Sequence, residues 1–273
     1  MDQGPQVIQL AVFGSPVNHS RSPGIHHSFA RQFGLDLNYR AIEADRETFP
    51  RLLEKFKAGG GSGCNVTVPL KHEAWKLAQQ NSDSSSQAQA ANTLLLNEEN
   101  EWIADNTDGR GLIQDLASNL NCQLPGARIC IIGAGGAVAG ILGDLLAQGP
   151  DGLVIANRTL ERAEQLGERF ENIEAISLTD LQLQSPFDLV INATSLGHDG
   201  KHPELPSSMF HSGSLCYDLN YGVAADPLRN YCTETNIRFQ DGFGMLVEQA
   251  ALSFKLWTGK IPDTGPLLTQ LVQ

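Results

Sequence analysis

A glycine-rich turn and a basic cluster lie one strand–helix–strand unit apart in this 273-residue chain. The turn consists of Gly133, Ala134, Gly135, Gly136 and Ala137. It follows a predicted strand at 128–132, which is apolar after Arg128, and it precedes a helical stretch at 138–147. Glycines in this context let the backbone approach a pyrophosphate that the helix N-terminus then holds. Val138 stands where a third glycine is usual, so an ordinary tight turn is the alternative interpretation.

The basic cluster follows the next predicted strand, 153–156, and consists of Asn157, Arg158, Thr159 and Arg162. An NAD site usually has a carboxylate at this place, against the ribose 2′-hydroxyl. A carboxylate would repel a 2′-phosphate, whereas guanidinium groups and a threonine hydroxyl can hydrogen-bond to it. The cluster therefore predicts that the cofactor is NADP rather than NAD.

Two serines follow the first predicted strand, at the edge where open α/β sheets bind ligands. Ser20 and Ser22 are two residues apart in a strand-to-helix turn, so their hydroxyls could bind a small carboxylate. A structural interpretation competes for one of them, because Ser22 precedes Pro23 and could cap the helix. That interpretation leaves Ser20 unexplained.

A lysine and an aspartate could perform acid–base chemistry. Thr67 and Lys71 follow the third predicted strand, and Asp108 lies where the first domain is expected to give way to the second. Taken singly, Lys71 could be a solvated surface residue and Asp108 could cap the following helix. Together, at a predicted interdomain cleft beside a nicotinamide domain, they suggest proton transfer during hydride transfer at a carbonyl.

The elements that would position these residues alternate between strands and helices, which predicts an α/β fold with two α/β domains. We expect residues 1–106, completed by 241–273, to form a substrate-binding and catalytic domain, and residues 107–240 to form a Rossmann-like NADP-binding domain. The apolar helix at 245–257 would return to the first domain. In the first domain we expect mostly parallel strands, with strands at 7–13, 37–42 and 63–68, helices at 22–33, 49–58 and 70–80, and polar loops at 59–63 and 81–86.

Composition limits the function further. The net charge of -12 disfavours binding to nucleic acid or anionic membrane, and no apolar run approaches the roughly 20 residues of a membrane span. The N-terminus lacks a signal-peptide pattern, so we expect a cytoplasmic protein. Five cysteines without a Cys-x-x-Cys pair indicate no disulfide framework. His198 and His202 have the spacing of helical metal ligands but lie in a predicted loop, so no metal site is expected.

These motifs, in this order, resemble those of shikimate dehydrogenases over nearly the whole chain. The resemblance rests on the segments above and on residues 14–23, 65–71, 92–94, 105–109, 192–197 and 241–249. It implies reversible NADPH-dependent reduction of 3-dehydroshikimate to shikimate, a step of aromatic amino acid biosynthesis, by a monomer or homodimer.

The resemblance also implies roles for individual residues. Lys71 is the expected proton donor and acceptor, with Asp108 holding it in place. The residues expected to face the substrate carboxylate are Ser20, Ser22 and Tyr221, and those expected to reach its hydroxyls and carbonyl are Thr67, Lys71, Asn92, Asp108 and Gln249. Thr194 and Gly242 join the glycine turn and the basic cluster as expected cofactor-binding residues.

Three positions depart from the family pattern. Gln89 replaces a usual glycine, Val223 replaces a common proline, and Ala139 lies where a basic residue is common. Two other functions remain open: a paralogous quinate/shikimate dehydrogenase, and a nucleotide-sensing protein that keeps the fold without turnover. The presence of both Lys71 and Asp108 favours an enzyme.

Overall fold

The computed structural model describes residues 7–269 and contains two compact units. Unit 1 holds the chain up to Gly111 and again from Leu246, and unit 2 holds Leu112–Met245. Both boundaries fall within helices, namely α5 (Asp108–Gln114) and α9 (Phe243–Thr258). The boundaries predicted from the sequence, 106/107 and 240/241, lie shortly before them.

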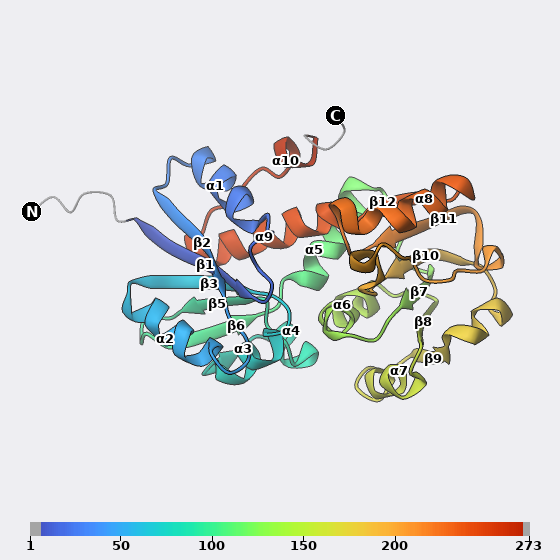
Figure 1. Cartoon of the computed structure of the whole chain (residues 1–273), viewed down its shortest axis with the longest axis horizontal. Coiled ribbons are helices and arrows are strands. Elements are labelled where there is room, and N and C mark those ends of the chain that lie inside the picture. The colour runs from blue at the N-terminus through green and yellow to red at the C-terminus, as the bar shows by residue number, and fades with distance from the viewer. Residues whose placement is uncertain (1–6, 270–273) are drawn as a thin grey trace, which may run out of the picture. The chain divides into compact units, whose positions relative to one another are not determined.

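Unit 1 is built on a six-stranded sheet in the order β2-β1-β3-β5-β6-β4 (Figure 1). Its strands are β1 (Ile8–Gly14), β2 (Leu37–Glu43), β3 (Gly61–Val66), β4 (Gln80–Asn81), β5 (Thr93–Leu96) and β6 (Trp102–Asp105). The pairs β1/β2, β1/β3 and β4/β6 are parallel, whereas β5 is antiparallel to both β3 and β6. The expected parallel strands are therefore present, but an unpredicted β5–β6 hairpin extends the sheet.

The helices of unit 1 bury an aromatic-rich core against this sheet. They are α1 (Ser22–Gln32), α2 (Phe49–Ala58), α3 (Lys71–Leu77), α4 (Asp83–Ala88) and most of α9, whereas α10 (Gly265–Thr269) buries no residue. On one side Phe13 makes edge contacts with Phe49 and Phe56 of α2, at centroid distances of 5.5 and 5.7 Å. Phe254 of α9 packs against Phe29 of α1, with both side chains fully buried. These contacts explain why α9 is apolar on most faces.

Two loop predictions in unit 1 were wrong. The serine-rich segment expected as a loop at 81–86 contains most of α4, because Ser82 accepts a hydrogen bond from the Ser85 backbone and so begins a helix. The glycine segment at 59–63 contains the start of β3, since Gly61 leaves space for the Phe56 ring and can lie in the sheet. In both cases the polar, glycine- or serine-rich composition predicted a loop where the structure has a helix or a strand.

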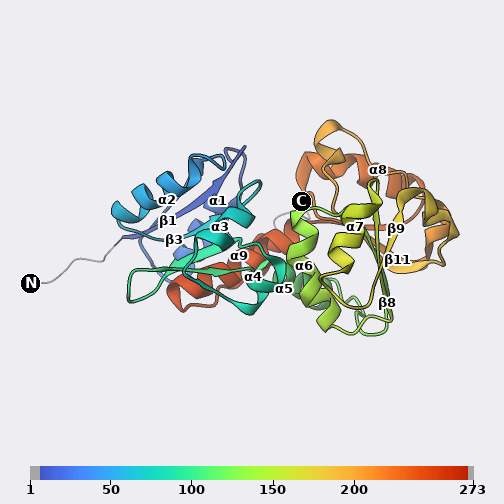
Figure 2. The same ribbon diagram turned by 90° about the horizontal axis from the view of Figure 1, so that it is seen from below.

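Unit 2 has a six-stranded parallel sheet of Rossmann type in the order β12-β11-β10-β7-β8-β9. Its strands are β7 (Arg128–Ile132), β8 (Gly152–Asn157), β9 (Ile173–Ser177), β10 (Phe187–Asn192), β11 (Phe210–Asp218) and β12 (Arg238–Asp241). Helices α6 (Gly136–Ala147) and α7 (Leu160–Gly167) contribute to the core on one face of the sheet, and α8 (Asp226–Glu234) contributes on the other (Figure 2). The central strands β7 and β8 are mainly apolar, as expected for strands that are covered on both faces.

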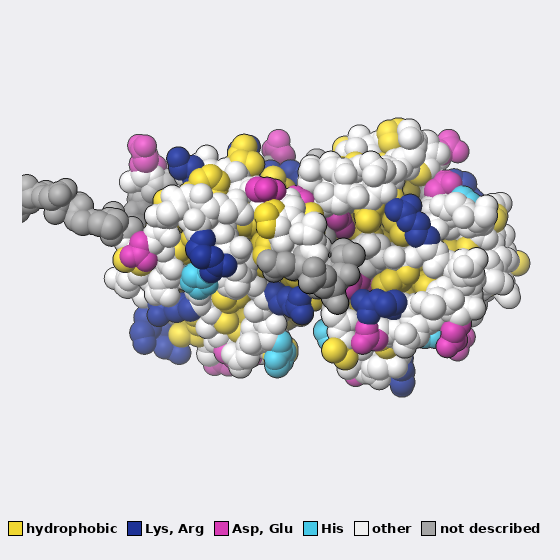
Figure 3. All heavy atoms as spheres, turned by 90° about the horizontal axis from the view of Figure 1, so that it is seen from above, with side chains coloured by type: hydrophobic (Ala, Val, Ile, Leu, Met, Phe, Trp, Pro, Cys, Tyr) yellow, Lys and Arg dark blue, Asp and Glu magenta, His cyan; other side chains and the backbone are white. Residues whose placement is uncertain are grey.

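The surface carries dispersed charge. On the face drawn in Figure 3, Lys and Arg side chains form several separate groups, with Asp and Glu side chains elsewhere on the same face. Within the described part of the chain, no helix is both long and apolar enough to cross a bilayer.

Candidate active site

Four strand ends of unit 1 meet at one edge of its sheet. The strands β1 and β3 run parallel and end there, at Gly14 and Val66. Because β5 runs antiparallel to β3, it begins at the same edge, with Thr93 opposite Asn65. The β5–β6 hairpin then returns the chain, so that Asp105 lies opposite Thr93. The loops after β1, after β3, before β5 and after β6 are therefore neighbours, although they are far apart in the sequence.

This arrangement brings Lys71 and Asp108 together. The Lys71 Nζ donates to Asp108 Oδ2 at 2.5 Å, and the two side chains are 17% and 8% exposed. Lys71 is the first residue of α3 and Asp108 the first residue of α5. Partial exclusion from water strengthens the pairing, and the Lys71 side chain keeps some exposure to solvent.

The structure fixes the orientation of the Asn92 side chain. Its Oδ1 accepts the Thr107 backbone N–H at 2.9 Å, and a backbone N–H can only donate. The Asn92 Nδ2 must then be the donor to Asp108 Oδ1 (2.8 Å) and to Gln249 Oε1 (3.1 Å). Gln249 in turn donates from Nε2 to the Leu246 carbonyl. Four residues predicted to act on substrate, Lys71, Asn92, Asp108 and Gln249, therefore form one hydrogen-bonded cluster.

A buried polar layer lies next to this cluster. It consists of Asn65, Thr93, Thr107 and Ser253, whose side chains hydrogen-bond to one another and to Asn92. On its far side, Asn65 Oδ1 accepts from the Tyr39 hydroxyl at 2.7 Å. Burial raises the pKa of the Tyr39 phenol well above its ordinary value, and a hydrogen bond with Ser22 opposes that rise.

The structure contradicts only the capping alternative for the two serines after β1. Ser22 is buried and is the first residue of α1, and its side chain caps no backbone group. Instead the Ser20 hydroxyl accepts the Ser22 backbone N–H at 3.3 Å, so Ser20 accounts for the helix start. Thr67 lies on the adjacent loop, where its methyl group packs against Gly14 and its N–H bonds to the Phe13 carbonyl. The loops bearing Ser20, Ser22 and Thr67 thus share the edge where Lys71 lies.

Sequence reasoning missed the residues that support the acid–base pair. The alternative in which Asp108 caps α5 is wrong, because the Asn106 side chain accepts the Asp108 backbone N–H at 3.0 Å. Gly111 has no room for a side chain, since a Cβ there would lie 2.7 Å from the Gln249 backbone nitrogen. It therefore lets α5 pack closely against α9. The spacing of Asn106 before a helix could have revealed the cap; the packing of Gly111 has no sequence signal.

The glycine turn of unit 2 fits a pyrophosphate group. Gly133 has φ +114°, a conformation that favours glycine, and a Cβ there would lie 3.2 Å from the Ala193 carbonyl group. Gly135 and Gly136 are exposed, with no atom within 4 Å of the place where a Cβ would lie, and α6 begins at Gly136 without a side-chain cap. Ala137 follows in the first turn of the helix, and Ala134 precedes it. The open backbone N–H groups at a helix start suit an anion.

The basic cluster follows β8, next to that turn. Arg158, Thr159 and Arg162 are exposed, and no ion pair within residues 7–269 engages either guanidinium group. Asn157 donates from Nδ2 to the Thr159 carbonyl at 2.8 Å, which shapes the start of α7. Two guanidinium groups that no described carboxylate engages suit a phosphate dianion.

The remaining predicted residues of unit 2 follow β10, β11 and β12. The Thr194 hydroxyl and N–H both donate to Asn192 Oδ1. Gly242 is enclosed, since a Cβ there would overlap the Leu219 carbonyl oxygen. Tyr221 is half-buried and makes an edge contact with the Phe243 ring, at 6.4 Å. Near them, burial raises the pKa of Asp218 to about 6, against hydrogen bonds from Asn220 and Asn192 that lower it.

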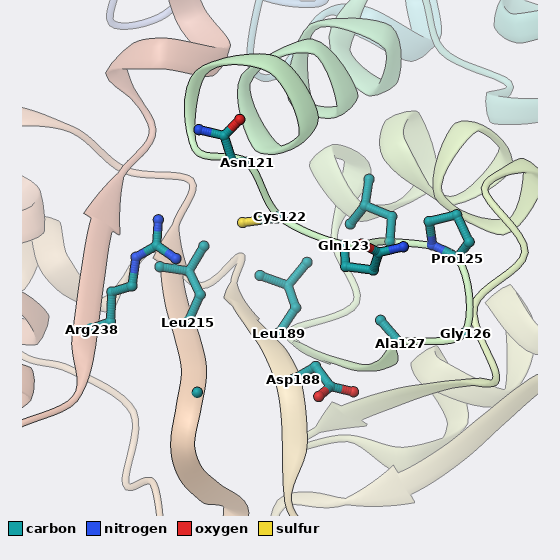
Figure 4. Close-up of a pocket in the computed structure, with 12 residues that line it drawn as sticks. Asn121, Cys122, Gln123, Pro125, Gly126, Ala127, Asp188, Leu189, Leu215 and Arg238 are labelled. Atoms are coloured by element: carbon teal, nitrogen blue, oxygen red, sulfur yellow. The ribbon is translucent and has the colours of Figure 1, made fainter.

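Two pockets of unit 2 lie at opposite ends of its sheet. One, of about 290 Å³, is lined by residues around the starts of β7, β10 and β12, including Ala127, Asp188 and Arg238 (Figure 4). None of the residues predicted to bind substrate or cofactor lines it. The other, of about 800 Å³, includes Thr194 and residues that follow β9 and β10. The second pocket therefore lies at the carboxyl edge, where α/β sheets bind ligands.

Comparison with known proteins identifies a family for this combination of features. The chain matches the family models described as shikimate dehydrogenase substrate binding domain (residues 12–94), shikimate / quinate 5-dehydrogenase (115–208) and shikimate 5′-dehydrogenase C-terminal domain (242–271). A shikimate dehydrogenase (NADP(+)) of Methylococcus capsulatus is 45% identical over 270 residues, which cover 97% of this chain and 96% of that protein. One of Marinobacter nauticus is 42% identical over 266 residues, covering 96% and 97%.

A solved structure agrees with these relatives. Shikimate 5-dehydrogenase of Thermus thermophilus, crystallised in complex with NADP(H) and shikimate, is 30% identical with a TM-score of 0.81, and the match covers 94% of this chain and 96% of that one. The predicted two-domain α/β fold with a Rossmann-type unit is thereby confirmed. With the sequence motifs, the fold and near-complete coverage in agreement, the chain belongs to the shikimate dehydrogenase family.

Proposed function

We propose that this chain catalyses the reversible NADPH-dependent reduction of 3-dehydroshikimate to shikimate. The observation that carries the proposal is the Lys71–Asp108 pair, joined at 2.5 Å and hydrogen-bonded to Asn92 in a family of NADP-dependent enzymes. A ketone reduction needs a proton donor beside the carbonyl oxygen, and a lysine ammonium supplies one.

NADP is the cofactor. Two features of unit 2 support an assignment of its phosphate groups. We assign the pyrophosphate to the turn from Gly133 to Ala137 and the 2′-phosphate to the cluster from Asn157 to Arg162. Thr194 and Gly242 would contact the cofactor from the loops after β10 and β12. A bound NADPH supplies the hydride that reduces a carbonyl carbon.

In the reduction, Lys71 transfers a proton from Nζ to the carbonyl oxygen and becomes a neutral amine, which solvent reprotonates. In the reverse reaction the amine takes the proton from the hydroxyl group. Asp108 stabilises the protonated lysine and holds Nζ in one position. Asn92 contributes by holding the second Asp108 oxygen, so the carboxylate cannot turn away from Lys71.

We assign substrate binding to the polar side chains predicted from the sequence. Ser20, Ser22 and Tyr221 would hydrogen-bond to the substrate carboxylate, and Thr67 and Gln249 to ring hydroxyl groups. Asn92 donates a hydrogen bond to Gln249. A substrate hydroxyl group that binds to both side chains would either replace this hydrogen bond or add to it. The proposed partners are thus small molecules alone. We further propose that the protein works in the cytoplasm as a monomer or homodimer, without nucleic acid or membrane.

The test follows NADPH absorbance with 3-dehydroshikimate and, in reverse, NADP⁺ with shikimate. Wild-type protein should turn over, and Lys71→Ala should lower kcat by about 10² to 10⁴-fold while NADPH binding changes little. Lys76→Ala is the matched control, because Lys76 lies on the same helix α3 and takes no part in the acid–base pair. Turnover of Lys71→Ala near the wild-type rate would refute the mechanism. Faster turnover of quinate than of shikimate, or with NAD than with NADP, would refute the substrate or cofactor assignment.

A further inference from the structure

A second carboxylate lies three residues before Asp108 and is more fully hydrogen-bonded than Asp108 itself. Asp105 is 6% exposed, and its Oδ1 accepts from the Ser82 hydroxyl (2.6 Å), the Ser84 hydroxyl (2.8 Å) and the Asn106 backbone N–H (2.8 Å). Its Oδ2 accepts from the Arg110 guanidinium. Burial alone would raise the pKa of Asp105, but the hydrogen bonds and the charge of Arg110 outweigh burial and lower it. Asp105 is therefore an ionised group held from several sides.

The two serine hydroxyls that donate to Asp105 come from a segment for which the sequence predicts no function. Ser82 and Ser84 belong to the serine-rich segment around α4, and their hydroxyls are 3.0 Å apart. Ser85, a buried residue of α4, donates from its hydroxyl to the Ala104 carbonyl. The serine hydroxyls thus connect α4 to the end of β6, at the residue from which the turn to Asp108 starts.

The turn between Asp105 and Asp108 is fixed by Asn106 and Arg110. Asn106 Oδ1 accepts the Asp108 N–H at 3.0 Å, and Asn106 Nδ2 donates to the Ala90 carbonyl at 3.0 Å. Arg110 donates both to Asp105 and to the Asn106 carbonyl. Hydrogen bonds from side chains therefore hold the backbone of this turn, including the N–H group of Asp108.

We propose that the Asp105–Arg110 ion pair, with Ser82 and Ser84, positions Asp108 against Lys71. Asp105 and Arg110 are positioning residues, since neither contacts the Lys71 side chain in the described hydrogen bonds and ion pairs. The inference rests on the proposed function, because it gives the pair a role in that reaction. A small displacement of a catalytic group can lower the rate by up to about 10²-fold. Residues that hold Asp108 in position can therefore affect kcat.

Kinetics provide the first test. Arg110→Ala should lower kcat by about tenfold and leave the KM for NADPH unchanged, and Arg110→Lys should restore part of the loss because the charge remains. In an Asp108→Asn background, Arg110→Ala should cause no further loss, since a positioning residue acts through the group that it positions. Arg31→Ala is the control, because Arg31 is an exposed arginine of the same unit. Equal losses of kcat in both backgrounds would overturn the proposal.

The ion pair itself is tested by a double-mutant cycle. Asp105→Asn keeps an oxygen for the Asn106 N–H and the serine hydroxyls but removes the charge that Arg110 pairs with. Asp105→Asn and Arg110→Ala together should be no worse than the worse single variant. Multiplicative losses would show that the two side chains act separately and would overturn the claim of a pair.

Amide hydrogen exchange, followed by NMR without substrate or cofactor, separates this inference from the proposed function. The Asp108 N–H should exchange about tenfold faster in Arg110→Ala than in the wild type, because its acceptor Asn106 loses an anchor, and Arg31→Ala should not change it. If the wild type fails to turn over, the proposed function is wrong and exchange alone decides the inference. If the wild type turns over but Arg110→Ala matches it in rate and exchange, only the inference is refuted.

Discussion

The buried histidine of α1 should make the stability of this protein sensitive to acid. His26 is fully buried, its ring stacks on Tyr39 at 4.5 Å, and its Nε2 lies 3.1 Å from Asn65 Oδ1. Asn65 Nδ2 donates to the Asn92 backbone carbonyl, which can only accept, so Asn65 Oδ1 faces donors and His26 Nε2 carries the proton. The His26 Nδ1 has no hydrogen-bond partner among the described atoms.

This environment favours the neutral ring. Burial lowers the pKa of His26 from 6.5 to about 3, with the nearby His27 also lowering it and the hydrogen bond to Asn65 acting in the opposite direction. Above pH 6.5 the folded and unfolded chains are both neutral at this residue, so it adds no pH dependence. As the pH falls below 6.5 the unfolded chain takes up a proton that the folded chain refuses, and the free energy of unfolding falls by about 1.4 kcal/mol per pH unit. The loss from about pH 8 to about pH 5 is then about 2 kcal/mol, a large fraction of the roughly 5–15 kcal/mol typical of a domain.

The assay is urea unfolding of the wild type and of His26→Gln at several pH values from about 8 to about 5. Glutamine keeps an N–H donor for Asn65 and cannot titrate, so the loss over this pH range should be smaller in the variant by about 2 kcal/mol. Phe29→Leu is the control, because Phe29 contacts His26 and cannot titrate; it should destabilise about equally at every pH. Parallel pH curves for wild type and His26→Gln would refute the reasoning.

Three further predictions concern the ligand sites and one departure from the family pattern. Replacing Arg158 and Arg162 together by Ala should reduce the preference for NADP over NAD by at least about tenfold, since each charge-assisted bond contributes roughly 1.5–3 kcal/mol; equal losses for both cofactors in steady-state kinetics would contradict this. Replacing Ser20 and Ser22 together by Ala should raise the KM for shikimate more than it lowers kcat, and a collapse of kcat at unchanged KM would count against carboxylate binding. Gln89→Gly should raise the free energy of urea unfolding by about 1 kcal/mol, because Gln89 has φ +49° at the end of α4; a loss of stability would show that its side chain matters more than its backbone.

The sequence by itself determined the strand-linked motifs. Gly133 and Arg158 each follow a continuous apolar strand, and parallel strands of a Rossmann unit bring their carboxyl ends to one edge. Connections between parallel strands are almost always right-handed, which limits the possible orders of the strands. A local sequence pattern was therefore enough to predict where the cofactor binds. Lys71 was likewise predicted at the end of a parallel strand.

Only the tertiary structure decided how Lys71 meets its partners. The β5–β6 hairpin consists of two four-residue strands with no distinctive turn signal, and it reverses the chain so that Asn92 and Asp108 return to the edge where Lys71 lies. The serine-rich segment around α4 has the composition of a loop, and only the fold brings the Ser82 and Ser84 hydroxyls to the buried Asp105 carboxylate. Such contacts join residues 15 to 160 positions apart, and their free energy depends on burial that no local pattern records.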